Sequence, residues 1–173
     1  MKPERLSDIK KELISLSNEQ LIEISLKLAK YKKENKELLS YLLYEAANPL
    51  QYADSVKASL LEGFQTLKRH HYYSTKELRK ILRLLAKHAK YTGLPQVELE
   101  LLLWFCKNYL HYADTRSNHK PLQMILVRQL EKAKKLLGKL HEDLQFDYAE
   151  EYNAILEEAE QNARWFNKKA FEL

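Results

Sequence analysis

The predicted fold depends on residues 74–112, which read STKELRKILRLLAKHAKYTGLPQVELELLLWFCKNYLHY. Its first part has amphipathic helical spacing, and Ser74 and Glu77 stand in the pattern of a capping box at its start. Gly93 suits the left-handed residue that ends a helix, and Pro95 suits the first position of the next one. The stretch therefore predicts a helical hairpin.

The second arm of this hairpin, residues 95–112, is apolar in nearly every direction around the helix. Only Glu100 and Lys107 form a polar stripe on it. Such a helix must be covered on several sides. It is too short and too charged to span a bilayer, which takes about 20 apolar residues. We therefore expect it to be the central helix of the fold.

The composition favours an all-α protein. The chain has 173 residues but only three glycines and four prolines, too few for the turns of a β-protein. We expect a single all-helical domain, residues 1–173, with seven or eight antiparallel helices around the central helix. The sequence leaves open whether they form a bundle or a short α-solenoid. The other expected helices span residues 7–16, 36–47 (capped by Asn35), 50–68, 121–137 and 146–166, and the last residues are expected to fray. One more helix is expected to open at a second capping box, Ser17 to Gln20, and to include Ala29.

The single cysteine, Cys106, excludes an internal disulfide. Its place on an apolar helix predicts a small buried hydrophobe, whereas a reactive thiol needs a basic partner that the sequence does not identify. The first residues lack the apolar run of a signal peptide. We expect a cytoplasmic protein that does not enter a membrane.

Charge is unevenly distributed along the chain. The formal net charge is +5, yet residues 140–163 carry eight acidic residues and no Lys or Arg, so the remainder carries 29 − 16 = +13. One helix face forms a basic stripe, a candidate site for nucleic acid or an acidic protein. The alternative is an ordinary solvated face, or one paired with the acidic segment. The stripe consists of Lys76, Arg79, Lys80, Arg83, Lys87 and Lys90.

No pattern of catalytic, metal-binding or cofactor-binding residues stands out. Phosphate loops, paired metal-binding cysteines and Glu-x-x-His pairs are all missing from the sequence. An acidic set beginning at His141 and Glu142 resembles hard-cation ligands, but a solvated acidic helix explains it better. His88 is expected to be a hydrogen-bonded histidine at the edge of the core. We predict no catalytic residue, cofactor, metal or small-molecule ligand.

Eleven tyrosines are more than the core of a simple bundle needs. Tyrosine suits half-buried rims and interfaces, because its ring packs while its hydroxyl stays hydrated. Tyr41, Tyr44, Tyr109 and Tyr112 are therefore expected either to border the core or to form a surface for self-association or a protein partner.

The opening residues resemble a family of small all-helical bacterial proteins known only as a domain of unknown function. The similar segments are residues 9–13, 16–22 and 36–42. The helix pair of residues 21–43 is also similar to those of HEAT-like helical repeats. A partial echo between residues 17–30 and 74–87 is compatible with two stacked helical units. Neither resemblance implies an activity or site residues.

These observations predict a non-catalytic interaction or scaffold module built from helix pairs. The alternative is a nucleic-acid-binding accessory protein that uses the basic stripe between Lys76 and Lys90.

Overall fold

The structure is a computed structural model that describes residues 2–173. Over these residues it contains eight α-helices, one short 3₁₀-helix and no strand, which confirms the predicted all-α fold. The chain divides into two compact units, residues 1–47 and residues 48–173, each with its own internal contacts. The single domain expected over residues 1–173 stays a prediction.

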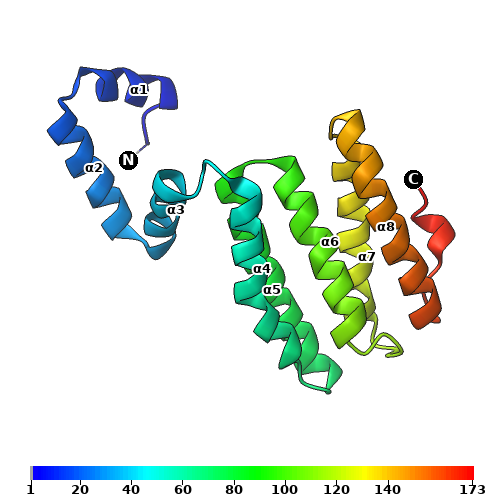
Figure 1. Cartoon of the computed structure of the whole chain (residues 1–173). Helices are drawn as coiled ribbons and strands as arrows, with labels where there is room; N and C mark the ends of the chain where they lie inside the picture. The colour runs from blue at the N-terminus through cyan, green and yellow to red at the C-terminus, as the bar shows by residue number, and fades with distance from the viewer. Residues whose placement is uncertain (1) are drawn as a thin grey trace. The chain divides into compact units, whose positions relative to one another are not determined.

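The first unit consists of three helices, of which α2 packs against α3 (Figure 1). Ser17 caps α2 as predicted. Its hydroxyl accepts a hydrogen bond from the Gln20 amide at 3.3 Å, and the Gln20 side chain accepts one from the Ser17 amide at 2.9 Å. The helices span Leu6–Ser15 (α1), Asn18–Tyr31 (α2) and Lys33–Tyr44 (α3).

The start predicted for α3 was wrong. Asn35 lies inside the helix, which begins at Lys33. The Asn35 amide group donates instead to the carbonyl of Leu28, at 2.8 Å, near the end of α2. From the first turn of α3, the Asn35 side chain therefore satisfies the C-terminal end of α2 and does not cap its own helix.

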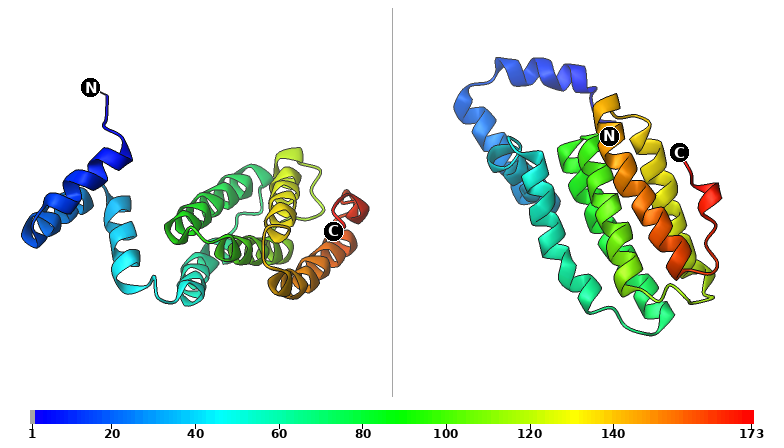
Figure 2. Two further views of the ribbon diagram at one scale, coloured as in Figure 1. Left: turned by 90° about the horizontal axis from the view of Figure 1, so that it is seen from above. Right: turned by 45° about the vertical axis from the view of Figure 1, so that its right-hand side comes forward.

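The second unit stacks five helices in two layers. Seen end-on, α5 and α7 lie in one layer and α4, α6 and α8 in the other (Figure 2, left). Contacts run both between consecutive helices and between next neighbours within a layer, as in stacked helix pairs. The bounds are Pro49–Gln65 (α4), His71–Thr92 (α5), Pro95–Tyr112 (α6), Lys120–Leu137 (α7) and Glu142–Asn162 (α8), followed by a 3₁₀-helix, η1, at Lys168–Ala170.

The central helix α6 forms the middle of this unit, as its composition predicts. It contacts α4, α5, α7 and α8, and Leu99, Leu103, Phe105 and Tyr109 on it are fully buried. Cys106 is also buried and unpaired, and burial raises the pKa of its thiol. Tyr109 belongs to the core and not to its rim, because its side chain is fully buried. Its hydroxyl donates to the Leu122 carbonyl at 3.0 Å.

The capping box predicted at Ser74 was wrong. Helix α5 begins three residues earlier, at His71, so Ser74 and Thr75 lie inside it and are buried. Both hydroxyls donate to the His71 carbonyl, at 3.4 and 2.6 Å. The Glu77 carboxylate accepts from the Lys68 amide at 3.3 Å, so it serves the preceding loop and not the helix start. The end of α5 is as predicted, because Gly93 is left-handed with φ 65°.

The C-terminal residues are packed, contrary to expectation. Helix α8 ends at Asn162, four residues before the predicted end, and the chain then turns back. The rings of Phe166 and Phe171 stack at 5.0 Å and both are buried. The hydroxyl of Tyr152 donates to the Phe171 carbonyl at 3.1 Å. These contacts hold the end of the chain on α8.

Candidate functional site

Half of the predicted basic stripe lies beside α7. Lys76, Arg79 and Arg83 of α5 line a hollow of about 680 Å³ that Pro121, at the start of α7, also lines. A second hollow of about 380 Å³ adjoins it and shares Arg79 and Pro121. We call these two hollows the α5–α7 groove. Its other lining residues are Tyr72, Thr75, Leu82, His119, Lys120, Met124, Ile125, Arg128 and Gln129.

The other half of the stripe does not line this groove. Lys80 lines a hollow on the α4 side of the helix, together with Glu62 and Glu77. Lys87 is half-buried, and Lys90 is exposed near the end of α5. Three of the six residues therefore line the groove and three do not, and the binding role predicted for the stripe stays a prediction.

The α5–α7 groove is lined by five Lys and Arg side chains and no acidic one. Three come from the predicted stripe, and α7 adds Lys120 and Arg128. Across residues 2–173, none of these five takes part in an ion pair. Sequence reasoning missed Lys120 and Arg128 because they lie about 40 residues along the chain from the stripe, and only the packing of α5 on α7 joins them.

Three histidines border the groove where α5 and α7 begin. The ring centroids of His70 and His71 lie 4.5 Å apart, and those of His71 and His119 lie 4.3 Å apart. Desolvation, together with the positive charges of His71, Arg79 and His70, lowers the pKa of His119. A cation is therefore disfavoured here and an anion is favoured.

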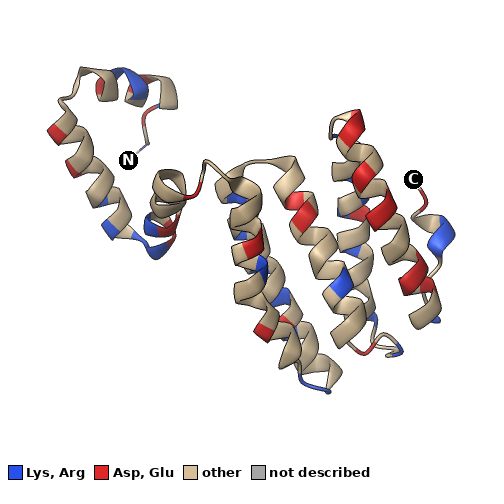
Figure 3. Ribbon diagram, in the orientation of Figure 1, with Lys and Arg blue, Asp and Glu red and all other residues tan. Residues whose placement is uncertain are grey.

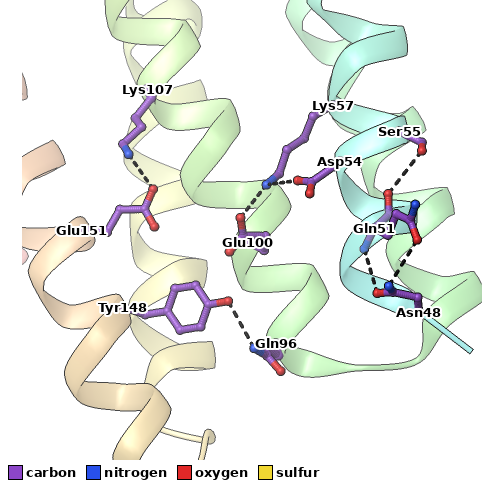
Figure 4. Close-up of polar contacts among 10 residues, drawn as sticks. All are labelled: Asn48, Gln51, Asp54, Ser55, Lys57, Gln96, Glu100, Lys107, Tyr148 and Glu151. Carbon is purple, nitrogen blue, oxygen red and sulfur yellow. Dashed lines mark hydrogen bonds and ion pairs between the residues drawn. The ribbon is translucent and has the colours of Figure 1, made fainter.

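Ion pairs join neighbouring helices within the layer of α4, α6 and α8. Lys57 of α4 pairs with Glu100 of α6 at 2.5 Å, and Lys107 of α6 pairs with Glu151 of α8 at 2.6 Å (Figure 4). The polar stripe predicted on α6, Glu100 and Lys107, thus has a partner on each flanking helix.

The acidic segment does not cover the groove. Its acidic residues lie along α8, as the red ribbon of Figure 3 shows, and α8 packs on α6 and α7. In the described part of the chain, its contacts with Lys and Arg are Glu151 with Lys107 and Glu157 with Lys168. The predicted alternative of a stripe paired with residues 140–163 is not supported for the five groove cations.

The first unit exposes an unusual amount of apolar side chain. Tyr41 is the one residue of positions 2–47 that is buried. Twelve large hydrophobic side chains of α1–α3 are exposed, against seven over residues 48–173. We call these twelve the apolar surface of α1–α3. They are Leu6, Ile9, Leu13, Ile14, Ile22, Ile24, Leu26, Leu28, Tyr31, Leu42, Leu43 and Tyr44.

Another residue singled out by the sequence, His88, has a structural role. His88 shares a hydrogen bond of 2.6 Å with the Tyr52 hydroxyl, which confirms the predicted boundary histidine.

Within residues 2–173, no group of three or more His, Cys, Asp or Glu side chains is arranged to hold a metal ion. In the same residues, no helix has the length and apolar character needed to cross a bilayer.

Comparisons with known proteins add no family. No family model, no curated protein and no solved structure matches the chain. The resemblances to a family of unknown function and to HEAT-like repeats stay predictions.

Proposed function

We propose that this chain is a non-catalytic interaction module that associates with a second copy of itself through the apolar surface of α1–α3. The observation that carries the proposal is the contrast within these helices: one buried residue against twelve exposed large hydrophobic ones. Large exposed apolar surface is characteristic of protein interaction sites.

The size of the first unit strengthens this argument. A unit of about 50 residues that contains no cysteine depends on its apolar core, and among its described residues this unit buries one side chain. Burying an exposed Leu or Ile side chain fully contributes about 1.5–3 kcal/mol. Covering several of the twelve would therefore stabilise the unit substantially.

Charge favours a second copy as the occupant. Residues 1–47 contain nine Lys or Arg and eight Asp or Glu, a net charge of 9 − 8 = +1. Some of these charges are already paired on their own helix, such as Lys27 with Glu23 at 2.8 Å. Two copies would therefore repel each other little, and the surface shows no excess of one sign that would recruit a charged partner. A two-fold arrangement places the same apolar surface on both sides of the interface.

Light scattering after size-exclusion chromatography tests this proposal. We expect the chain to shift from monomer to dimer between about 1 and about 100 μM. Ile22→Glu with Leu26→Glu changes two side chains on one face of α2, both half exposed or more, and should leave a monomer. The control pair is Leu94→Glu with Phe146→Glu, which are exposed in the second unit and should still dimerise.

Two results would overturn the proposal. One is a wild-type chain that stays monomeric over the whole range. The other is a dimer that the α2 pair leaves intact and the control pair abolishes. Circular dichroism of both variants shows whether they remain helical.

We further propose a cytoplasmic location, because the chain, with one cysteine, has no internal disulfide, as is usual in a reducing compartment. A bacterial origin is proposed on the resemblance alone.

A further inference from the structure

We propose that the α5–α7 groove binds single-stranded nucleic acid, with its Lys and Arg side chains contacting phosphates and Tyr72 stacking on a base. This inference uses residues 48–173 and does not depend on self-association through α1–α3.

The cations of the groove come from two helices and face one hollow surface. Lys76, Arg79 and Arg83 line it from α5, and Lys120 and Arg128 line it from α7. All five are exposed, so each reaches a ligand without displacing packed residues. No carboxylate lines the groove. A chain of phosphates is the ligand whose charge repeats along such a groove.

The start of α7 adds to the positive field. No side chain caps this helix, whose N-cap is His119. The N-terminal end of an 18-residue helix carries a partial positive charge and favours an anion nearby. The rings of His71 and His119 stand at the same end, and an anion in the groove would favour the charged form of His119.

The exposed ring of Tyr72 favours nucleic acid over other polyanions as the ligand of the groove. Tyr72 lines the groove and is 61% exposed, and its ring meets that of Tyr73 edge-on at 5.4 Å. An exposed ring beside a row of cations suits a base that stacks while its phosphates pair. An acidic peptide would use the cations but not the ring. A duplex hides the faces of its bases, so the ring favours a single strand.

Fluorescence anisotropy with labelled oligonucleotides tests the inference. The probes are an oligothymidylate and an oligouridylate of about 15 nucleotides, which separate DNA from RNA. A duplex of the same length and a poly-glutamate peptide compete for the same groove. Five phosphate contacts on a single strand predict a loss of affinity of about 100-fold between about 50 and about 200 mM salt.

Variants locate the site. Arg79→Glu with Arg128→Glu reverses one charge on each helix and should weaken binding by more than about 10-fold. The control, Lys139→Glu with Lys169→Glu, changes net charge equally at exposed positions outside the groove and should have little effect. Tyr72→Ala should weaken binding to a single strand by about 10-fold. The monomeric α2 variant, Ile22→Glu with Leu26→Glu, should bind like the wild type.

Four results would overturn the inference. They are no salt-sensitive binding at about 50 mM salt, equal loss in the groove and control pairs, equal affinity for duplex and single strand, and tighter binding of poly-glutamate than of either oligonucleotide. The last result would assign the groove to an acidic protein.

Discussion

Lys57 of α4 and Glu100 of α6 form an ion pair across two helices, with Nζ 2.5 Å from Oε1. The Lys57 side chain is 15% exposed and also contacts Asp54 at 3.1 Å. Burial lowers the pKa of Lys57, but the hydrogen bonds and charges of Glu100 and Asp54 outweigh it and raise the pKa above its usual value. The pair allows the most apolar helix of the chain to carry a carboxylate against its neighbour.

Removing the charge of Glu100 should destabilise the second unit. Glu100→Gln leaves a largely buried ammonium group with one partner, and we expect a loss of about 1–2 kcal/mol in the free energy of unfolding, measured in urea. Glu157→Gln breaks the more exposed pair with Lys168 and should cost less than about 0.5 kcal/mol. Equal losses in the two variants would contradict the role assigned to burial.

The pH dependence of that loss has a definite sign. Because the pKa of Lys57 is raised on folding, its contribution is fully present below its ordinary pKa and is lost as pH rises through the raised value. The difference between wild type and Glu100→Gln should stay constant between about pH 7 and about pH 9. It should then shrink above about pH 10.5, which chemical denaturation at several pH values would detect.

Two serines with the same local sequence pattern should respond differently to alanine. Ser17 caps α2, so Ser17→Ala should cost about 1 kcal/mol, seen as faster hydrogen exchange of the α2 amides. Ser74 lies inside α5, where alanine is a better helix former. Ser74→Ala should leave exchange in α5 slower or unchanged. Faster exchange at the start of α5 would mean that Ser74 is a cap after all.

Local sequence patterns predicted the fold well where the side chains allow only one position for a helix. Residues 95–112 are apolar nearly all round, so only a central position satisfies them, and α6 has that position with the predicted bounds. Helix starts were harder. Ser74 and Asn35 carry side chains that cap helices in other settings, but here Ser74 bonds the His71 carbonyl within α5 and Asn35 bonds the Leu28 carbonyl in the last turn of α2. Sequence spacing alone does not reveal those carbonyls.

The candidate site was less predictable because it depends on packing between helices. The spacing of Arg79 and Arg83 indicated a basic face, but not that α7 would bring Arg128 beside it. Equally, Lys80 has the same spacing as its neighbours yet lies on the α4 side. The apolar surface of α1–α3 was also missed, since a periodic helix pattern indicates which side chains need covering but not whether the chain itself covers them.

Two glycines that both end a helix should respond in opposite directions to alanine. Gly93 has φ 65°, a conformation that costs an L-residue about 1–2 kcal/mol, although a Cβ there meets nothing within 4 Å. Gly138 has φ −67°, and a Cβ there would lie 3.9 Å from the Lys134 carbonyl oxygen. Gly93→Ala should therefore lower the melting temperature, while Gly138→Ala should leave it unchanged or raise it. A similar decrease in both would show that backbone conformation is not the cause.

The hydroxyl of Tyr152 should control how the end of the chain packs. Tyr152→Phe removes the donor to the Leu130 and Phe171 carbonyls and should cost about 1 kcal/mol. Carboxypeptidase should then release the last residues faster than from the wild type. Tyr44→Phe, which changes an exposed tyrosine, is the control and should leave the digestion rate unchanged.

Tyr152 also makes stability depend on alkaline pH. Burial raises its pKa to about 12, so its neutral form contributes stability that is complete below the unfolded value, near 10, and is lost as pH rises toward 12. Tyr152→Phe should flatten this decline in the free energy of unfolding. An unchanged decline in the variant would assign it to other groups.

The positive field of the groove should be visible in the titration of His119. Its pKa is lowered by desolvation and by His71, Arg79 and His70, so removing one of these charges should raise it. We expect a higher pKa in Arg79→Gln, measured from the imidazole protons by NMR, and no change in Lys139→Gln. In the wild type, His119 loses its proton at a lower pH than a histidine with an ordinary pKa. Its contribution to stability is therefore present above the ordinary pKa and is lost as the pH falls through the folded value.

The same titration connects the field to a ligand. A phosphate chain in the groove adds negative charge near His119, so a saturating oligothymidylate should raise the pKa of His119 toward or above its ordinary value. By linkage, oligonucleotide affinity must then increase as the pH falls through that range. The groups whose charges act on the pKa of His119 are His71, Arg79 and His70, all on the α5 side. If Arg79→Gln raises the pKa while the oligonucleotide leaves it unchanged, the field is real but the ligand binds elsewhere.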